Sequence, residues 1–371
     1  MTAVPKGYSD KLDPGQQAFL KTGHGRFFAD NFLFMKAEHG YVIGPTGSGK
    51  TNKNYNLVNW LKYTEVILWI SASKDDDIIP LLFMGLPVNL IIPKYADVDI
   101  TAGGKRIENH PCKSFVNDPS DVIYAIKKDH INILEVRNAF WSRPALLDWM
   151  IEFFTIIADW TRRGTMPPIL PPTGTRGQTK ITVFLDESQW LIAGSKVTND
   201  PKRAKTTEII GENMLEIRTY GWRFVISSQG FTNIPPAIRD NMACKFLCNN
   251  AMVDDPPELR FHCKPNIPGW RGTASFKRNE WKFVSRNDKA SPNDRPMPVP
   301  LYPKDEHDRE QAKRMRVVYA KTYHDQPPAS AEAELECTPD LGRYAALAIP
   351  PEEREKIMVS VFDAPRIENE T

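Results

Sequence analysis

Residues 44–51 read Gly44-Pro45-Thr46-Gly47-Ser48-Gly49-Lys50-Thr51 and match the pattern G-x-x-x-x-G-K-[ST]. The apolar run 41–43 precedes them, and the helix-compatible run 52–62 follows them. A buried strand, a glycine-rich turn and a helix in this order form the setting in which such a loop binds phosphate groups. A glycine-rich surface turn is the alternative interpretation, and the two flanking runs argue against it.

The residue types in this loop suit a nucleoside triphosphate and its Mg²⁺. Glycines let backbone N–H groups face the phosphates, and the N-terminus of the following helix favours anions. Lys50 would place a positive charge near the β- and γ-phosphates, and Thr51 would offer its hydroxyl to Mg²⁺. We therefore predict a P-loop that binds ATP and Mg²⁺, formed by residues 44–51.

Short apolar runs recur through the first two thirds of the chain. They are rich in Val, Ile, Leu or Phe and lack the strict alternation of a half-exposed strand. The runs are 41–43, 65–70, 88–92, 131–136, 181–185, 223–227 and 245–248. Residues 143–160 carry apolar side chains at spacings of three and four, which is typical of an amphipathic helix. These patterns predict an α/β fold with a mostly parallel sheet.

The run 181–185 ends in two carboxylates, Asp186 and Glu187. An apolar strand that ends in this way is the arrangement of a Walker B element. Asp186 would hold the Mg²⁺ shell, and Glu187 would orient and deprotonate the attacking water, a role that suits hydrolysis. A strand ending in a solvated acidic turn is the alternative, which the upstream P-loop disfavours.

Three further residues are candidates for the catalytic step. Gln229 comes two residues after the run 223–227 and would be a sensor that hydrogen-bonds the attacking water or the γ-phosphate. Arg218 and Arg239 flank that strand, and either could reach a neighbouring subunit's nucleotide as an arginine finger. We prefer Arg218, with Arg239 as the alternative. A surface glutamine and a solvated or locally paired arginine are the competing interpretations.

The order of these motifs resembles the FtsK–HerA superfamily of DNA-pumping ATPases. The resemblance covers about residues 40–250 and rests on the P-loop, Asp186-Glu187, Arg218-x-x-Gly221, Gln229 and Ile234-Pro235-x-x-Ile238-Arg239-x-Asn241. Within the superfamily, the sequence looks most like viral genome-packaging ATPases of the poxvirus and membrane-containing phage type, with Zot-like proteins close behind.

This resemblance implies a RecA-like core with helices on both faces of the sheet. It also implies a homo-hexameric ring, ATP hydrolysis at subunit interfaces and double-stranded DNA threaded through the pore, with a capsid or membrane-vertex partner. We accordingly predict an ATP-driven DNA translocase that packages a viral genome, acting in the host cytoplasm or in association with the virion.

Two other functions remain open from the sequence. A phage assembly, secretion or DNA-transfer ATPase belongs to the same superfamily, although no apolar stretch is long enough to suggest a membrane anchor. A P-loop kinase or nucleotide switch is the rival of another class. Kinases need no water base of the Glu187 kind, and the guanine-reading Asn/Thr-Lys-x-Asp string is absent from the sequence. Both observations favour an ATPase.

Composition divides the chain into three parts. Residues 1–38 form a leader segment with the aromatic cluster Phe27, Phe28, Phe32 and Phe34. Residues 39–250 form the P-loop core, and residues 251–371 form an irregular proline-rich extension. The extension is basic at first, with eight basic and two acidic residues in 260–289. It is acidic at its end, with four basic and ten acidic residues in 331–371. The two regions are therefore expected to have different partners.

Contacts with DNA would need basic groups that bind phosphates without reading bases. Lys202, Arg203 and Lys205 follow the Walker B strand and could line a pore, and Arg162, Arg163, Arg176 and Lys180 form a second basic region. Solvated charged loops are the alternative for both. Residues 270–283 interleave aromatic and basic side chains, as single-strand binders do, but an edge hairpin explains them as well.

The net charge and the cysteines bear on the partners of the protein and on possible disulfide or zinc sites. A formal charge of +2 gives no strong basic field over the whole chain. Five scattered cysteines and no signal-peptide pattern point to free thiols in a reducing compartment. Cys244, Cys248, His262 and Cys263 have poor spacing for a structural zinc site, so we predict none.

Overall fold

The computed structural model describes twelve stretches of the chain: residues 7–34, 37–71, 75–93, 96–108, 110–137, 139–140, 142–164, 181–192, 200–230, 233–251, 276–285 and 296–321. Internal contacts divide the chain into the units Met1–Tyr323 and His324–Thr371, and every described residue belongs to the first.

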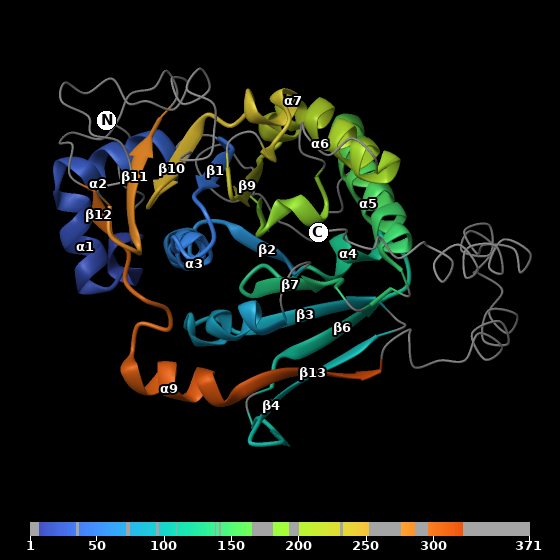
Figure 1. Cartoon of the computed structure of the whole chain (residues 1–371), viewed down its shortest axis with the longest axis horizontal. Helices are drawn as coiled ribbons and strands as arrows, with labels where there is room; N and C mark the ends of the chain where they lie inside the picture. The colour runs from blue at the N-terminus through green and yellow to red at the C-terminus, as the bar shows by residue number, and fades with distance from the viewer. Residues whose placement is uncertain are drawn as a thin grey trace, which may run out of the picture. The chain divides into compact units, whose positions relative to one another are not determined.

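A ten-stranded sheet forms the centre of this unit (Figure 1). Its order is β12 (Met297–Pro298), β11 (Glu280–Val284), β10 (Cys244–Cys248), β1 (Gly40–Ile43), β9 (Trp222–Ser228), β8 (Ile181–Leu185), β2 (Val66–Ser71), β7 (Ile131–Glu135), β3 (Val88–Pro93) and β6 (Cys112–Val116). The eight strands from β10 to β6 are mutually parallel, whereas β11 and β12 are antiparallel additions at one edge.

The seven apolar runs of the sequence all form strands of this sheet, as predicted. Six of them are buried at almost every position, because parallel strands in the middle of a sheet are covered on both faces. β1 pairs with β10 on one side and β9 on the other, so the segment before the P-loop lies deep in the sheet.

Helices cover both faces of the sheet, which confirms the predicted α/β class. On one face, α3 (Lys50–Leu61) packs with alternate strand residues such as Val42, Trp69 and Phe246. On the other face, Phe154 of α5 (Arg143–Arg163) contacts Phe224 of β9. In Figure 1, α5, α6 (Pro201–Thr219) and α7 (Pro236–Arg239) lie together, away from α3.

The N-terminal residues pack on the α3 face. The described elements there are the 3-10 turn η1 (Ser9–Lys11), α1 (Pro14–Lys21), α2 (Gly23–Phe28) and the π-helical turn η2 (Ala29–Leu33). Phe28 and Phe32 are fully buried, and the Phe32 ring centroid lies 5.0 Å from that of Phe246 in β10. The predicted leader segment is therefore part of the core packing.

A second, three-stranded sheet lies in the order β13 (Met315–Lys321), β4 (Asp97–Ala102) and β5 (Lys105–Arg106). These three strands were not predicted from the sequence. The remaining elements are η3 (Asp75–Phe83), α4 (Asp121–Ala125), η4 (Ser188–Trp190) and α9 (Glu306–Arg314). The long spacer between Lys50 and Asp186 thus holds five strands of the main sheet, namely β2, β3, β6, β7 and β8, together with the β4–β5 hairpin.

The predicted domain boundary near residue 250 falls inside the first unit. β11 pairs with β10 in antiparallel register from Lys245↔Val284 to Cys248↔Trp281, so residues after 276 extend the core sheet. The prolines of this segment argue only against strands in the middle of a sheet. β11 and β12 lie at one edge of the sheet, where a proline-rich segment can pair. Residues 280–283 of the aromatic and basic stretch belong to β11, and residues 270–275 lie outside the described part of the chain.

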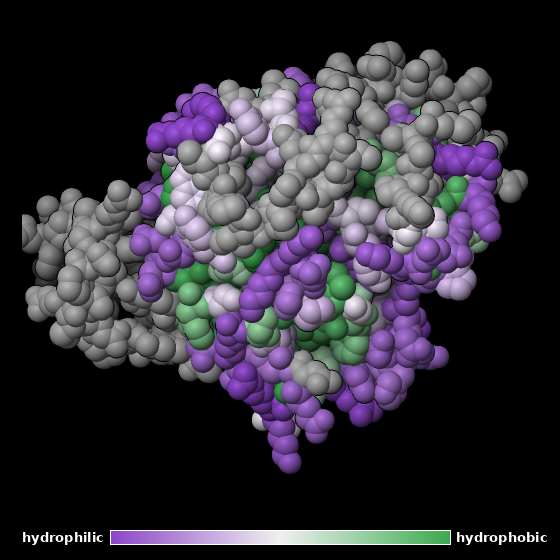
Figure 2. Space-filling view, turned by 180° about the vertical axis from the view of Figure 1, so that it is seen from behind, coloured by the Kyte–Doolittle hydropathy of each residue, from purple (hydrophilic) through white to green (hydrophobic). Residues whose placement is uncertain are grey.

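Hydrophilic side chains cover much of the surface drawn in Figure 2, with apolar residues between them. Phe115, Tyr124, Leu301 and Val318 are large apolar side chains that are between 43% and 56% exposed. They come from four different segments, and single exposed apolar residues are ordinary on soluble surfaces. Among the described helices, none is long and apolar enough to cross a membrane.

Candidate nucleotide-binding site

The P-loop connects β1 to α3, as the sequence predicts. Gly47 and Gly49 have φ angles of +79° and +98°, a region that side chains with a Cβ rarely adopt. A Cβ on Gly44 would lie 2.4 Å from Ser48 Oγ. The conformation of Gly47 and Gly49 and the close packing at Gly44 therefore require glycine at these three positions of the loop.

Polar groups in this loop suit an anion. Gly49 is the N-cap of α3 and has no side chain, so it leaves the first N–H groups of the helix available. Lys50 is only 7% exposed, and its Nζ donates to Pro45 O at 3.1 Å, across the loop. Ser48 Oγ is buried without a hydrogen-bond partner among the described residues. A phosphate group would satisfy donors of this kind.

Asp186 follows β8 and lies beside the P-loop helix. Its Oδ1 accepts hydrogen bonds from Asn54 Nδ2 at 3.0 Å and from the Ser227 hydroxyl. Burial raises the pKa of Asp186, while the hydroxyls of Ser227 and Thr51 and the charge of Lys50 act in the opposite direction. Its Oδ2 is buried and has no hydrogen-bond partner in the described part of the chain.

These observations fit a bound Mg²⁺. Oxygen atoms are the ligands that Mg²⁺ prefers, and a buried carboxylate oxygen without a donor needs a positive partner. The Thr51 hydroxyl acts on the same carboxylate from the first turn of α3. Thr51 and Asp186 are thus placed together, as their predicted role requires, and the role itself stays a prediction.

Glu187 has a left-handed backbone, with φ +48° and ψ +54°. Its N–H donates to Ser227 Oγ at 3.1 Å and to Asp186 Oδ1 at 3.2 Å, which holds the turn after β8 in place. A glutamate in this conformation costs roughly 1 kcal/mol or more, and such strain is concentrated at functional sites. The conformation turns Glu187 out of the strand direction that Asp186 follows, so the two carboxylates can serve different roles.

Gln229 lies at the end of β9, next to the P-loop. Gly44 N–H donates to Ser228 O at 3.2 Å, which joins the end of β9 to the first residue of the loop. The Tyr41 hydroxyl lies 2.6 Å from Ser228 Oγ and donates to Gly230 O at 2.8 Å. Gln229 itself is exposed between these two fixed neighbours. Its position is the one predicted for a sensor, and the sensor role stays a prediction.

The two candidate arginine fingers have acidic neighbours. Arg218, at the end of α6, forms an ion pair with Glu38 at 2.7 Å. It precedes the first residue of β9, so it lies at the opposite end of the strand from Gln229. Arg239, in α7, has its Nε 3.7 Å from Asp240 Oδ1 and is 14% exposed. Within one subunit, the ion pair with Glu38 thus holds Arg218 at the end of β9 opposite the P-loop.

The basic residues predicted to form a pore loop are helical. Lys202, Arg203 and Lys205 lie in the first turns of α6, which begins at Pro201 after the N-cap Asp200. Lys202 is paired with Asp148, and Lys205 with Glu208 at 2.8 Å. Arg203 is 8% exposed and donates to Ile192 O at 2.7 Å, so it stabilises the interior. The loop placement is wrong for these three residues because the Asp200-Pro201 pair starts a helix.

Other basic and sulfur-containing candidates are only partly described. Arg162 and Arg163 end α5, with ion pairs to Asp159 at 3.5 and 3.7 Å, while Arg176 and Lys180 lie outside the described residues. Cys244 and Cys248 are buried thiols of β10. His262 and Cys263 also lie outside the described part of the chain.

Sequence reasoning missed two residues of the site, Asn54 and Ser227. Asn54 follows Thr51 by three residues on α3, so helix geometry alone places the two on one face. Ser227 is adjacent to Asp186 because Leu185 pairs with Ile226 in the β8–β9 register. The first could have been found from spacing, whereas the second required the strand order.

A mostly parallel sheet with helices on both faces, this loop after β1 and these carboxylates after β8 is the fold of a P-loop NTPase core. No protein-family model matches the chain, and no curated protein matches it in sequence. The comparison with solved structures finds ATPases that are similar to this chain at low sequence identity.

One similar structure is EssC (ATPases 2 and 3) from Geobacillus thermodenitrificans, with 11% identity and a TM-score of 0.44 over 76% of this chain and 42% of that one. Another is the genome packaging NTPase B204 from Sulfolobus turreted icosahedral virus 2 with ATP-gammaS, with 11% identity and a TM-score of 0.41 over 72% of this chain and 100% of B204. Thermomonospora curvata EccC (ATPases 2 and 3) has 12% identity and a TM-score of 0.40 over 76% and 41%. The chain thus spans less than half of the EssC and EccC structures.

Proposed function

We propose that the protein is an ATP-driven translocase of double-stranded DNA that packages a viral genome. The observation that carries the ATPase part is the contact between the P-loop helix and the Walker B strand, in which Asn54 Nδ2 donates to Asp186 Oδ1 at 3.0 Å. This contact joins the helix that begins with Lys50 and Thr51 to the strand that is followed by Asp186 and Glu187, which supports the proposal. The DNA part rests on the resemblance of the motifs to DNA-pumping ATPases.

The side chains have distinct tasks in this proposal. Lys50 and the P-loop N–H groups bind the phosphates, and Thr51 and Asp186 hold Mg²⁺, which supplies positive charge to the phosphate oxygens. Glu187 orients a water molecule and takes up its proton. Gln229 hydrogen-bonds the same water or the γ-phosphate. Arg218, with Arg239 as the alternative, acts on the nucleotide of a neighbouring subunit in a hexamer.

The nucleotide chemistry is tested with two substitutions. We expect Lys50→Ala to abolish binding of Mg·ATP, because it removes the buried charge at the loop. Glu187→Gln should retain binding and lower kcat by roughly 10²- to 10⁴-fold, because the amide cannot accept the proton. Nucleotide titration and steady-state hydrolysis separate the two effects. Equal loss of binding in both variants would contradict the role given to Glu187.

The DNA part is tested by measuring ATP hydrolysis with and without linear duplex DNA while recording the oligomeric state in the same buffer. A rate raised several-fold by duplex DNA in a hexamer supports the translocase. Turnover indifferent to DNA in a monomer would favour a kinase or switch acting on another substrate. A hexamer stimulated by a polypeptide and not by DNA would favour a secretion ATPase.

The chain offers a matched pair of lysines for the DNA contact. Lys205 on α6 and Lys313 on α9 are both exposed and each forms an i,i+3 ion pair, with Glu208 and Glu310. If Lys205 contacts a phosphate, Lys205→Ala should lower the slope of log affinity against log salt by about 1, whereas Lys313→Ala should leave it unchanged. Equal slopes in both variants would remove Lys205 from the DNA contact.

A further inference from the structure

A turn of the C-terminal extension lies directly against the P-loop. Asn279, in the turn that leads into β11, donates its N–H to Ser48 O at 3.3 Å, and its own carbonyl accepts from Val299 N–H at 2.7 Å. A Cβ on Gly49 would lie 2.4 Å from Asn279 Oδ1 and 3.2 Å from Asn279 Cα. Asn279 is thus in contact with the two loop residues that precede Lys50.

The hydrogen bond to Ser48 acts on a peptide unit of the loop. The Ser48 carbonyl and the Gly49 N–H belong to one planar trans peptide, so they point in opposite directions. When Asn279 holds the carbonyl on its own side, the Gly49 N–H must point away from Asn279. The contact therefore fixes the orientation of one of the N–H groups with which a P-loop binds phosphate.

The turn itself is built to present Asn279. Its φ of +64° is left-handed, a conformation that asparagine tolerates better than most residues. Lys277 N–H donates to Glu280 Oε2 at 2.6 Å, and Glu280 N–H donates to Lys277 O at 3.0 Å, which closes the turn around Asn279. Local hydrogen bonds thus hold the residue in the conformation that meets the loop.

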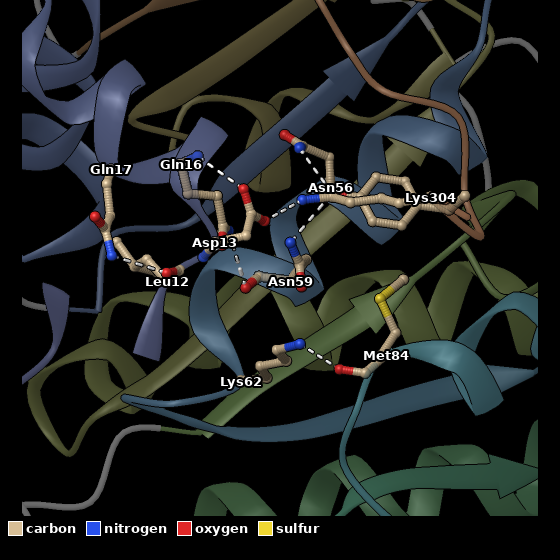
Figure 3. A network of polar contacts seen from close by, with 10 residues as sticks. Leu12, Asp13, Gln16, Gln17, Asn56, Asn59, Lys62, Met84 and Lys304 are labelled. Carbon is tan, nitrogen blue, oxygen red and sulfur yellow. Dashed lines mark hydrogen bonds and ion pairs between the residues drawn. The ribbon is translucent and has the colours of Figure 1, made fainter. Parts of the chain in front are cut away.

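The same extension continues along α3. Asn52 exchanges two hydrogen bonds with it, from Nδ2 to Pro300 O at 2.9 Å and from Tyr302 N–H to Oδ1 at 3.0 Å. The Lys53 ammonium, fully buried, lies 3.0 Å from the Trp281 ring centroid. Further along the helix, Asn56 and Asn59 donate to the Tyr302 hydroxyl at 3.2 and 3.3 Å, in the network that also includes Lys304 (Figure 3).

We infer that the turn 277–280 is part of the nucleotide site and that Asn279 is a positioning residue for the phosphate-binding loop. The ligand is the phosphate chain of the nucleotide, so the inference rests on the proposed nucleotide binding. Docking of the turn orients the loop for phosphate, and bound phosphate in turn stabilises the docked turn, because coupling between two binding events is reciprocal.

The affinity for Mg·ADP, followed with a fluorescent ADP analogue, tests this inference. Asn279→Gly keeps the N–H and the left-handed turn, so its affinity should stay within about twofold of wild type. Asn279→Pro removes the N–H and cannot adopt φ +64°, so binding should weaken roughly tenfold, the effect expected of one lost hydrogen bond. Gly103→Pro is the control, since Gly103 is also left-handed, with φ +59°, and lies in the β4–β5 turn of the second sheet.

Amide hydrogen exchange provides a second readout that a purely structural role would not change. Bound Mg·ADP should slow exchange in the turn 277–280 of the wild-type protein and leave it unchanged in Asn279→Pro. Unfolding midpoints of the two proline variants show whether both remain folded. The inference is overturned if Asn279→Pro binds like wild type, if Gly103→Pro weakens binding equally, or if the turn exchanges at the same rate with and without nucleotide.

Lys50→Ala separates failure of this inference from failure of the proposed function. If Lys50→Ala loses binding while Asn279→Pro retains it, the P-loop binds nucleotide and the turn does not position it. If Lys50→Ala also binds like wild type, nucleotide binding at this loop is itself wrong, and the inference falls with it.

Discussion

His39 is a buried imidazole that uses both ring nitrogens. Nε2 lies 2.8 Å from Met214 O, and Nδ1 accepts from Phe224 N–H at 3.0 Å. These partners require a neutral ring with its proton on Nε2. Burial lowers the pKa of His39 to about 4, and the charges of Arg218 and Arg223 also lower it, against the opposing effect of the bond to Met214.

This burial makes stability depend on pH. The unfolded chain protonates His39 near pH 6.5, whereas the folded protein keeps it neutral down to about pH 4. The unfolded state therefore binds more protons between these values, so the free energy of unfolding should fall as pH drops through this window. The loss from this residue should reach about 3 kcal/mol. Urea unfolding at a series of pH values measures it.

His39→Gln is the comparison for that measurement. It is less stable at pH 7.5 because it loses ring contacts, but its unfolding free energy should depend less on pH between 4 and 6.5. His24, His110 and His130 also have lowered pKa values and remain in both proteins. A variant with the same pH slope as wild type would show that His39 does not titrate in this way.

At the scale of secondary-structure elements, a buried ion pair between Glu65 and Arg223 connects the neighbouring strands β2, β8 and β9. Arg223 Nη2 lies 3.2 Å from Glu65 Oε1, and both side chains are fully buried. Glu65 precedes β2, Arg223 belongs to β9, and the hydroxyl of Thr182 in β8 donates to Glu65. Arg223 also donates to Phe32 O at 2.9 Å, which ties the N-terminal segment to the sheet. The pair thus connects elements that are far apart in sequence.

Breaking this pair should be costly. Glu65→Gln leaves the Arg223 charge buried without its counter-charge, and we expect a loss of about 3–5 kcal/mol in unfolding free energy. Glu208→Gln, which breaks the exposed pair with Lys205, should change stability by less than about 1 kcal/mol. Urea unfolding compares the two variants.

Replacing both partners of the buried pair tests the cause of that loss. The double variant with Glu65→Leu and Arg223→Met removes both charges, so it should recover much of the loss seen with Glu65→Gln alone. If the double variant is less stable than Glu65→Gln, hydrogen bonds to Thr182 and Phe32, and not the unpaired charge, dominate the energetics of this site.

At the scale of the whole molecule, the question is whether subunits complete each other's sites. Arg218 forms an ion pair with Glu38 of its own subunit and lies before the amino end of β9. The Arg218 side chain is 21% exposed. A finger role and a structural role therefore make different predictions. If Arg218 acts on a neighbour's nucleotide, Arg218→Ala should keep nucleotide binding and lose turnover, whereas Glu38→Gln should keep both.

Mixing experiments identify an effect between subunits. Arg218→Ala subunits mixed with Glu187→Gln subunits should regain some hydrolysis, because some interfaces then combine an intact Arg218 with an intact Glu187. No recovery at any ratio would count against a finger acting between subunits. Equal losses of stability, with unchanged kcat, in Arg218→Ala and Glu38→Gln would assign Arg218 a structural role.

The sequence by itself determined the local part of the site. The P-loop is contiguous, its glycines are required by its own backbone, and the apolar runs before the P-loop, Asp186 and Gln229 are long enough to specify buried strands. Because parallel strands end at one edge of a sheet, placing these three motifs together needed only the fold class. That is why the positions of Lys50, Thr51, Asp186 and Gln229 could be predicted.

Only the tertiary structure decided which distant residues complete the site. Asn54 meets Asp186 across 132 residues, Ser227 meets it through the β8–β9 register, and Asn279 reaches Ser48 from a segment that composition assigned to a separate extension. Strand order and register determine these contacts, and neither can be read from the spacing of apolar residues in the sequence. Local patterns report which face of an element is buried, whereas the partner on that face depends on how the whole sheet is assembled.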